Sequence, residues 1–180
     1  KRAQAISVID IRYWWYQADG GLYAPQGGQH LAPRQHARLL NPKRSSFTQV
    51  VRAVREYRNR YPDKAVIYSA DSNYGWAVVM GGGSIPRLPA KTDKDLLKAV
   101  VRMKPYDLPE NAEGQYALAQ PGQQYLIYAQ AGQTVSIDLN SINGNFEIYN
   151  VDMKTGKAAS CGKHTTGGSN QSIELTDTPC

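Results

Sequence analysis

The stretch Ala5-Ile-Ser-Val-Ile-Asp-Ile-Arg-Tyr-Trp-Trp-Tyr16 decides the fold that this sequence predicts. Its first half is an apolar strand, and its second half is polar and aromatic. Parallel α/β folds present a site in this way, at the carboxyl end of a buried strand. Because side chains alternate along a strand, two different faces are expected. The face toward the helices carries Ile9, Ile11 and Tyr13. The opposite face, with Val8, Asp10 and Arg12, is expected to line the interior of a parallel barrel, where Asp10 and Arg12 would be paired.

A helix and a second strand follow this stretch. A loop rich in glycine and proline, from Gln17 to Arg44, separates the first strand from the helix. Ser46-Phe-Thr-Gln49 has the capping-box pattern that opens a helix, and Pro62 ends it. Ala65-Val-Ile-Tyr-Ser69 then reads as a short buried strand. Strand, loop, helix and strand make a βαβ unit, which predicts a parallel sheet.

Three local patterns mark the region from residue 81 to residue 110. Gly81-Gly-Gly83 lacks the lysine and the spacing of a phosphate-binding loop, so close backbone packing explains these glycines better. Thr92-Asp-Lys-Asp95 predicts a second capping box before another helix. Pro105 and Pro109 indicate a linker after that helix.

From Gln115 onward the periodicity is that of β-strands. Asp152-Met-Lys-Thr-Gly156 predicts a hairpin turn, with glycine at the position that needs a positive φ. The region is expected to form a small antiparallel β-sandwich. Its candidate strands are Tyr116–Ala119, Gln124–Ala129, Thr134–Leu139, Phe146–Val151 and Ser172–Leu175.

The formal charge of +6 is unevenly distributed along the chain. Twelve lysines and arginines lie in residues 1–64, against four acids, Asp10, Asp19, Glu56 and Asp63. A basic segment suits nucleic acid or an acidic glycan. A solvated helix face is the simpler interpretation for the four arginines of one helix, Arg52, Arg55, Arg58 and Arg60.

Two further properties of the composition limit the classes of protein. No apolar run approaches the roughly 18 residues that a membrane-spanning helix needs. The two cysteines, Cys161 and Cys180, are too few for a metal site. A disulfide in an exported protein and two separate thiols are both compatible with them.

The aromatic segment after the first strand is the first candidate for chemistry. Sugars expose apolar C–H faces ringed by hydroxyl groups, so aromatic rings beside polar groups suit them. The alternative is that these rings pack under the loop that follows. The candidate substrate contacts are Arg12, Trp14, Trp15 and Tyr23, together with Trp76 after the second strand.

The second candidate is the loop Gly27-Gly-Gln-His-Leu-Ala-Pro-Arg-Gln-His-Ala-Arg38. Arg34 and His36 are expected to contact substrate, because arginine binds carboxylates, such as those of uronic acids, through two hydrogen bonds. Arg38 is expected to hold the loop instead. His30 and His36 lack an evident third ligand, so we expect no metal and no cofactor.

The third candidate is Ser69-Ala-Asp71-Ser-Asn-Tyr74, at the end of the second strand. Glycoside hydrolysis uses two carboxyl groups across the scissile bond. Asp71 is the best-placed carboxylate for catalysis, and Asp10 is the second. The alternative for Asp71 is an N-cap of the helix that begins near Asn73.

With these segments, the chain resembles the C-terminal part of bacterial glycoside hydrolases with a clan-A-like (β/α)8 barrel, followed by a β-sandwich of collagen-binding type. The resemblance implies that residues 1–110 are the C-terminal part of the barrel and residues 111–180 the sandwich. Clan-A-like enzymes place a Glu nucleophile at the end of the seventh strand, whereas this neighbourhood offers Asp71. The acid/base would lie upstream. The resemblance rests on Val8–Trp14, Lys64–Asp71, Trp76–Ser84, Tyr116–Tyr128, Thr134–Leu139 and Tyr149–Gly156.

The sequence thus predicts an α/β plus all-β protein that is part of an exported glycoside hydrolase, secreted, periplasmic or on the cell surface. Its substrate would be a polysaccharide or oligosaccharide, acidic glycans included. The expected partners are this glycan and the remainder of the barrel, in the same or another chain, without nucleic acid or a membrane span. A non-catalytic carbohydrate-binding protein is the alternative. Nucleic-acid binding would weaken steeply with salt, and no motif that reads RNA or DNA supports it.

Overall fold

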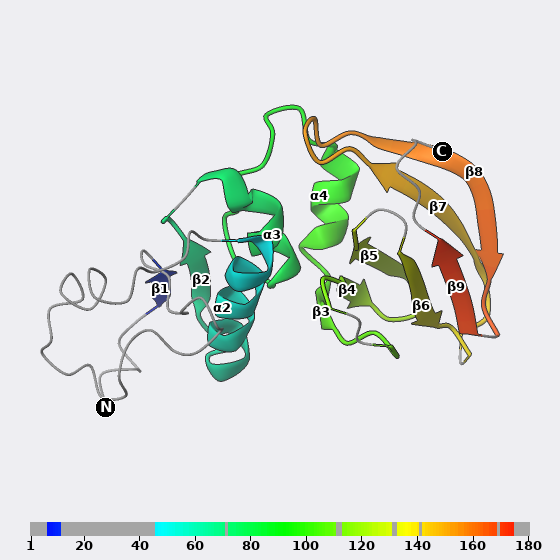
Figure 1. The fold of residues 1–180 in the computed structure, drawn as a ribbon, viewed down its shortest axis with the longest axis horizontal. Coiled ribbons are helices and arrows are strands. Elements are labelled where there is room, and N and C mark those ends of the chain that lie inside the picture. The colour runs from blue at the N-terminus through cyan, green and yellow to red at the C-terminus, as the bar shows by residue number, and fades with distance from the viewer. Residues whose placement is uncertain are drawn as a thin grey trace, which may run out of the picture. The chain divides into compact units, whose positions relative to one another are not determined.

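The computed structural model describes residues 7–11, 46–70, 72–110, 113–130, 133–140, 142–168 and 170–174. The chain divides into two compact units, Lys1–Arg87 and Leu88–Cys180. In the described residues, the first unit contains a parallel pair of strands with helices, and the second contains antiparallel sheets and the helix α4, Lys94–Val100 (Figure 1).

The first unit is built on a parallel pair, β1 (Val8–Ile11) and β2 (Ala65–Tyr68). Figure 1 shows the two arrows pointing the same way, and the register pairs Ile9 with Val66 and Ile11 with Tyr68. The helix α2 (Phe47–Arg60) precedes β2 along the chain. The predicted βαβ order and the parallel pairing are confirmed.

The N-terminus of α2 is capped as the sequence predicts, but by one bond of the capping box. Ser46 Oγ accepts the backbone N–H of Gln49 at 3.2 Å. Oε1 of Gln49 is buried and accepts no hydrogen bond from the described residues, so the return bond of the box is not made. At the other end, the Tyr61 N–H donates to the Tyr57 carbonyl, directly before Pro62.

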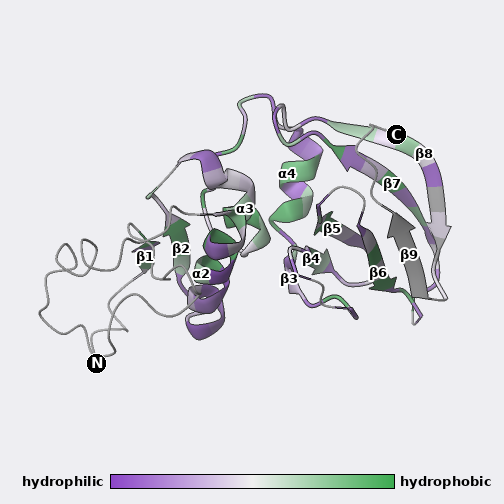
Figure 2. Cartoon of the chain, viewed as in Figure 1, coloured by the Kyte–Doolittle hydropathy of each residue, from purple (hydrophilic) through white to green (hydrophobic). Residues whose placement is uncertain are grey.

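One face of the parallel pair packs against the helices. Ile11 is 2% exposed and Val66 is fully buried, and α2 packs on β2 through its apolar stripe. Figure 2 shows hydrophilic residues in purple on α2 beside hydrophobic ones in green. After β2 come a short 3₁₀ helix, η2 (Ser72–Tyr74), and α3 (Gly75–Met80). The buried stripe of α2 consists of Val50, Val51, Ala53 and Val54.

The glycines after α3 lie where helix and backbone approach closely. A Cβ on Gly81 would lie 2.7 Å from Val54 Cβ. A Cβ on Gly83 would lie 2.5 Å from Val78 Cγ1 and 2.9 Å from Val54 Cγ1. These distances leave no room for a side chain, which confirms that the glycines serve close packing.

The predicted portion of a (β/α)8 barrel is wrong. Within the described residues the parallel sheet has two strands of four residues each. The outer edge of β2 is occupied at Val66, whose carbonyl accepts the Ser84 N–H at 2.6 Å. A barrel closes when each strand pairs with a strand on both sides, whereas here a turn after α3 takes that place. The expected remainder of a barrel loses its basis with this finding.

The N-cap of the helix α4 (Lys94–Val100) is one residue later than predicted, at Asp93 instead of Thr92. Asp93 is the N-cap, and its Oδ1 accepts the N–H groups of Asp95 at 2.8 Å and Leu96 at 3.3 Å. The hydroxyl of Thr92 donates instead to the Pro89 carbonyl at 2.7 Å. Thr92 is buried, so its side chain satisfies a local carbonyl rather than the helix terminus.

Among its described residues, the second unit holds three small antiparallel sheets rather than the two packed sheets of the predicted β-sandwich. The five predicted strands are present, and the sequence missed β3 and β8. Proline is tolerated on an edge strand, so Pro105 lies in β3 and not in a linker. The sheets are β3 (Lys104–Tyr106), β4 (Tyr116–Gln120) and β5 (Gln124–Tyr128); β6 (Thr134–Asp138) with β9 (Asn170–Glu174); and β7 (Asn145–Val151) with β8 (Ala158–Thr166).

The core of the second unit joins these sheets through apolar and aromatic side chains. Leu108, Ala117 and Val135 form a buried cluster that draws on β4 and β6. Tyr125 of β5 meets Phe146 of β7 edge-to-face, with the ring centres 6.0 Å apart. The β7–β8 hairpin is therefore anchored to the first sheet by its inner face.

The predicted turn between β7 and β8 is confirmed. Gly156 has a φ of 74°, and its N–H donates to the Asp152 carbonyl at 2.7 Å. The Asp152 carboxylate accepts the Lys154 N–H and the Thr155 hydroxyl, each at 2.8 Å. Separately, none of the described helices is both long and apolar enough to cross a membrane.

Candidate functional site

The candidate site lies at the carboxyl ends of β1 and β2. Asp10 is paired in register with Ile67, so Asp10, Ile67 and Ser69 are directed to the same face. The Ser69 hydroxyl donates to Oδ1 of Asp10 at 2.6 Å. The Ser69 N–H donates to the Ile11 carbonyl at 3.0 Å, which continues the ladder and fixes the serine beside the carboxylate.

This face is the more accessible side of the parallel pair. Val8, on the same face as Asp10, is 48% exposed, whereas Ile11 on the opposite face is buried. Asp10 itself is half-buried. The predicted packing of Ile11 against the helices is therefore confirmed, whereas the face of Val8 and Asp10, predicted to line a barrel interior, is partly exposed. The result is a carboxylate held in one orientation by a neutral donor, on a face that solvent reaches.

Most of the predicted site residues lie outside the described residues. These are the candidate catalytic residue Asp71 and the candidate substrate contacts Arg12, Trp14, Trp15, Tyr23, Arg34 and His36. The 3₁₀ helix η2 begins at Ser72, directly after Asp71 in the sequence. That start agrees with the expected beginning of a helical segment near Asn73.

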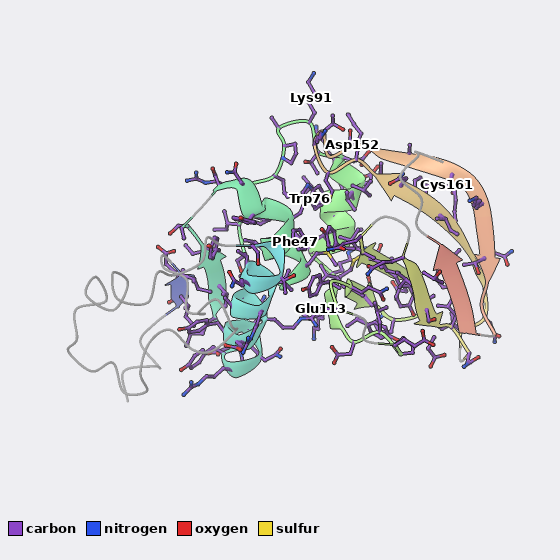
Figure 3. The ribbon with its side chains drawn as sticks, viewed as in Figure 1. Phe47, Trp76, Lys91, Glu113, Asp152 and Cys161 are labelled. Carbon is purple, nitrogen blue, oxygen red and sulfur yellow. The ribbon has the colours of Figure 1, made fainter. Side chains whose placement is uncertain are left out.

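Trp76 is the one predicted substrate contact that the structure describes. It lies in α3, where it is half-buried, and Gly75 and Ala77 on either side of it are buried (Figure 3). The helix α3 packs against α2. Trp76 therefore lies in the helical layer of the first unit and not on β1, the strand that carries Asp10.

Three of the four arginines of α2, Arg52, Arg58 and Arg60, make contacts within their own helix and its C-terminal turn. Arg52 pairs with Glu56 at 3.3 Å, one helical turn later. Arg58 donates to the Lys64 carbonyl at 2.7 Å and so holds the turn before β2. The Arg60 guanidinium lies 5.6 Å from the centre of the Tyr61 ring. These contacts support a solvated helix face over a nucleic-acid surface.

Two groups of residues were missed by the sequence reasoning as site components. Ser69 was seen only as part of a strand end, and its pairing with Asp10 depends on the register. The other group is on the β7–β8 hairpin, where Glu147, Tyr149 and Ser160 are joined by hydrogen bonds. The signal for it was the alternation Glu147-Ile-Tyr149 within a predicted strand, which places an acid and an aromatic on one face.

Neither a metal cluster nor a free cysteine occurs in the described part of the chain. No group of three or more His, Cys, Asp or Glu side chains gathers there as metal ligands would. Cys161, labelled in Figure 3, lies in β8. It is disulfide-bonded. The other cysteine of the chain, Cys180, lies outside the described residues.

A comparison with known families identifies one domain in this chain. The profile of the family described as "Domain of unknown function (DUF6298)" matches residues 1–103, which is more than half of the 180 residues. The chain belongs to the DUF6298 family. The DUF6298 match contains the Asp10–Ser69 pair and ends one residue before β3. No curated protein and no solved structure matches the chain.

Proposed function

We propose that this protein takes part in the hydrolysis of glycosidic bonds, with Asp10 supplying one of the two carboxyl groups. The observation that carries the proposal is the Asp10 carboxylate, held by the Ser69 hydroxyl at 2.6 Å at the carboxyl end of a parallel pair. Ligands of parallel sheets bind beyond the carboxyl ends of the strands. The aromatic sequence that directly follows β1, Arg12-Tyr-Trp-Trp-Tyr16, supports a sugar ligand.

Hydrolysis of a glycosidic bond requires a second carboxyl group. One group protonates the leaving oxygen, and the other attacks the anomeric carbon or removes a proton from the attacking water. Asp10 is the candidate for the second role, because the Ser69 hydroxyl orients its carboxylate at the carboxyl end of the parallel pair. In sequence, Asp71 follows Ser69 by two positions and is the candidate for the other role.

The test is hydrolysis of a panel of polysaccharides by the wild-type chain and by Asp10→Asn. We expect Asp10→Asn to lower turnover by about a hundredfold or more, since a catalytic carboxyl contributes at least that factor. Asp95→Asn is the matched control, because Asp95 is an exposed aspartate on α4. Turnover that is unchanged in Asp10→Asn would exclude Asp10 as a catalytic carboxyl group.

Non-catalytic carbohydrate binding is the second candidate function. Glycoside hydrolysis uses two carboxyl groups, whereas the strands β1 and β2 together hold a single one, that of Asp10. This observation favours binding without hydrolysis. Under this function, the migration of the wild-type chain is slowed in gels that contain a polysaccharide, but the chain releases no reducing sugar. Asp10→Asn then changes affinity alone, because no bond-breaking step is lost.

An exported location goes with either function. The support is the disulfide bond of Cys161, because disulfides persist in oxidising compartments and are rare in the reducing cytosol. Extracellular glycans are met in those same compartments. Fractionation of the native host, with this chain located by antibody, tests the proposal, and recovery in the cytosol would contradict it.

A further inference from the structure

The outward face of the β7–β8 hairpin carries a connected set of polar and aromatic side chains. The Tyr149 hydroxyl donates to Oε2 of Glu147 at 2.9 Å. The Ser160 hydroxyl, from the neighbouring strand, donates to Oε1 of the same carboxylate at 2.5 Å. Register pairs Tyr149 with Ser160, so all three residues share one face.

Tyr149 is one of the exposed large apolar residues of the second unit, with 53% of its surface exposed; the others among the described residues are Leu97, Val101 and Met153. The other face of the same strand packs inward, where Phe146 meets Tyr125. Tyr149 is therefore not part of the packed inner face of the strand. The strand register shifts between Glu147 and Tyr149, and such irregularities re-aim side chains at the surface.

Hydrogen bonds orient the Tyr149 side chain on this face. Its hydroxyl is tied to Glu147, which is tied in turn to Ser160 on β8. The hydrogen bond to Glu147 and the charge of that carboxylate raise the pKa of Tyr149, so the phenol stays protonated and remains a donor. A side chain oriented before a ligand arrives loses little conformational freedom on binding.

We propose that the Glu147–Tyr149–Ser160 face binds a neutral glycan, with a sugar ring stacked on Tyr149. The proposal rests on the proposed function for the class of ligand and adds a contact surface in the second unit. A sugar ring offers an apolar C–H face to the aromatic ring and hydroxyl donors to the polar groups beside it. Because the carboxylate of Glu147 lies in the same face, uronic acids and other anionic sugars are repelled.

The experiment is affinity electrophoresis of the full 180-residue chain in gels with a neutral polysaccharide, xyloglucan, or an acidic one, polygalacturonate. We expect retardation by xyloglucan and none by polygalacturonate. Tyr149→Ala and Tyr149→Leu lose the ring and should weaken binding by about tenfold. Tyr149→Phe keeps the ring and should lose less. Met153→Ala is the matched control, since Met153 is an exposed apolar residue, 40% exposed, at the turn of the same hairpin.

The outcomes separate this proposal from the proposed function. Retardation of Tyr149→Ala and Tyr149→Leu equal to that of the wild type overturns the glycan face, and so does binding to polygalacturonate alone or to neither polymer. Asp10→Asn is run in the same gels and assayed for sugar release. Loss of turnover in Asp10→Asn with unchanged binding by the Tyr149 variants leaves the hydrolase function standing without this face. The reverse result leaves the face standing without the hydrolase function.

Discussion

At the scale of single residues, Gly156 meets two requirements that no other amino acid meets together. Its φ of 74° is strained for a residue with a side chain. A Cβ there would lie 2.6 Å from Thr92 Cα and overlap the Thr92 hydroxyl. Its carbonyl also accepts the Asp93 N–H at 2.9 Å, which ties the hairpin turn to the start of α4.

Gly156→Ala is therefore expected to destabilise the protein by about 2 kcal/mol or more, as urea denaturation followed by circular dichroism would measure. The control is Gly122→Ala, because Gly122 has a similar φ of 81° with nothing within 4 Å of the added Cβ. Gly122→Ala should lose only the free energy that a positive φ costs a residue with a side chain, without a steric clash. Equal losses in both variants would show that the approach to Thr92 contributes nothing.

The same turn makes a prediction about acid. The hydrogen bond from the Thr155 hydroxyl, followed by that from the Lys154 N–H, lowers the pKa of Asp152 from its ordinary value of 3.8. A carboxyl group with a lowered folded pKa stabilises the folded state above its unfolded pKa, and this contribution is lost as the pH falls through the folded value. We expect the stability difference between wild type and Asp152→Asn to shrink below about pH 4. A difference that stays constant down to pH 2 would argue against the turn contacts.

At the scale of elements, α2 depends on its N-cap and its valine stripe together. Ser46 satisfies the Gln49 N–H, and the stripe with Val54 packs against the glycines after α3. Both features are local patterns of the sequence. The helix therefore formed where the sequence predicts it, from Phe47 to Arg60.

Ser46→Ala is expected to cost about 1 kcal/mol of stability, because the Gln49 N–H loses its acceptor. Ser46→Asp should retain most of the stability, since a carboxylate accepts the same bond and also suits the positive helix terminus. Chemical denaturation of the two variants provides the measurement. Equal stability of Ser46→Ala and wild type would mean that water replaces the serine at no cost.

At the scale of the whole molecule, the chain is two compact units joined by an irregular segment. The division falls between Arg87 and Leu88. Ile85 in this segment is 83% exposed and has a φ of 52°, which is unfavourable for a β-branched residue. Arg87 is also exposed. An exposed connection without regular structure is a preferred site of proteolysis.

Limited trypsin digestion is expected to cleave after Arg87 and to release a fragment that begins at Leu88. Mass spectrometry and N-terminal sequencing identify it. Arg87→Gln is the control, and it should remove this product while cleavage elsewhere continues. A persistent absence of the Leu88 fragment from wild-type digests would contradict an accessible connection between the units.

The sequence by itself determined the local features of this protein. Alternation predicted which face of β1 meets the helices, a serine and a proline bounded α2, and Asp152 to Gly156 predicted a turn. Each follows from residues close together in the chain, whose backbone preferences and side-chain spacing act locally. Close packing was likewise predicted for the three glycines and is found at Gly81 and Gly83, whereas Gly82 has a φ of 75°.

The tertiary structure alone decided the features that depend on pairing between segments far apart in the sequence. Whether a third strand pairs with the outer edge of β2 depends on which group donates to the Val66 carbonyl. The donor is the Ser84 N–H, which lies in a turn. Pro105 lies in a strand because β4 offers it an edge, and β8 forms on β7 despite a sequence without clean alternation. Ser69 meets Asp10 across 59 positions of sequence. No local pattern encodes such contacts, because register and edge pairing are set by the packing of distant segments.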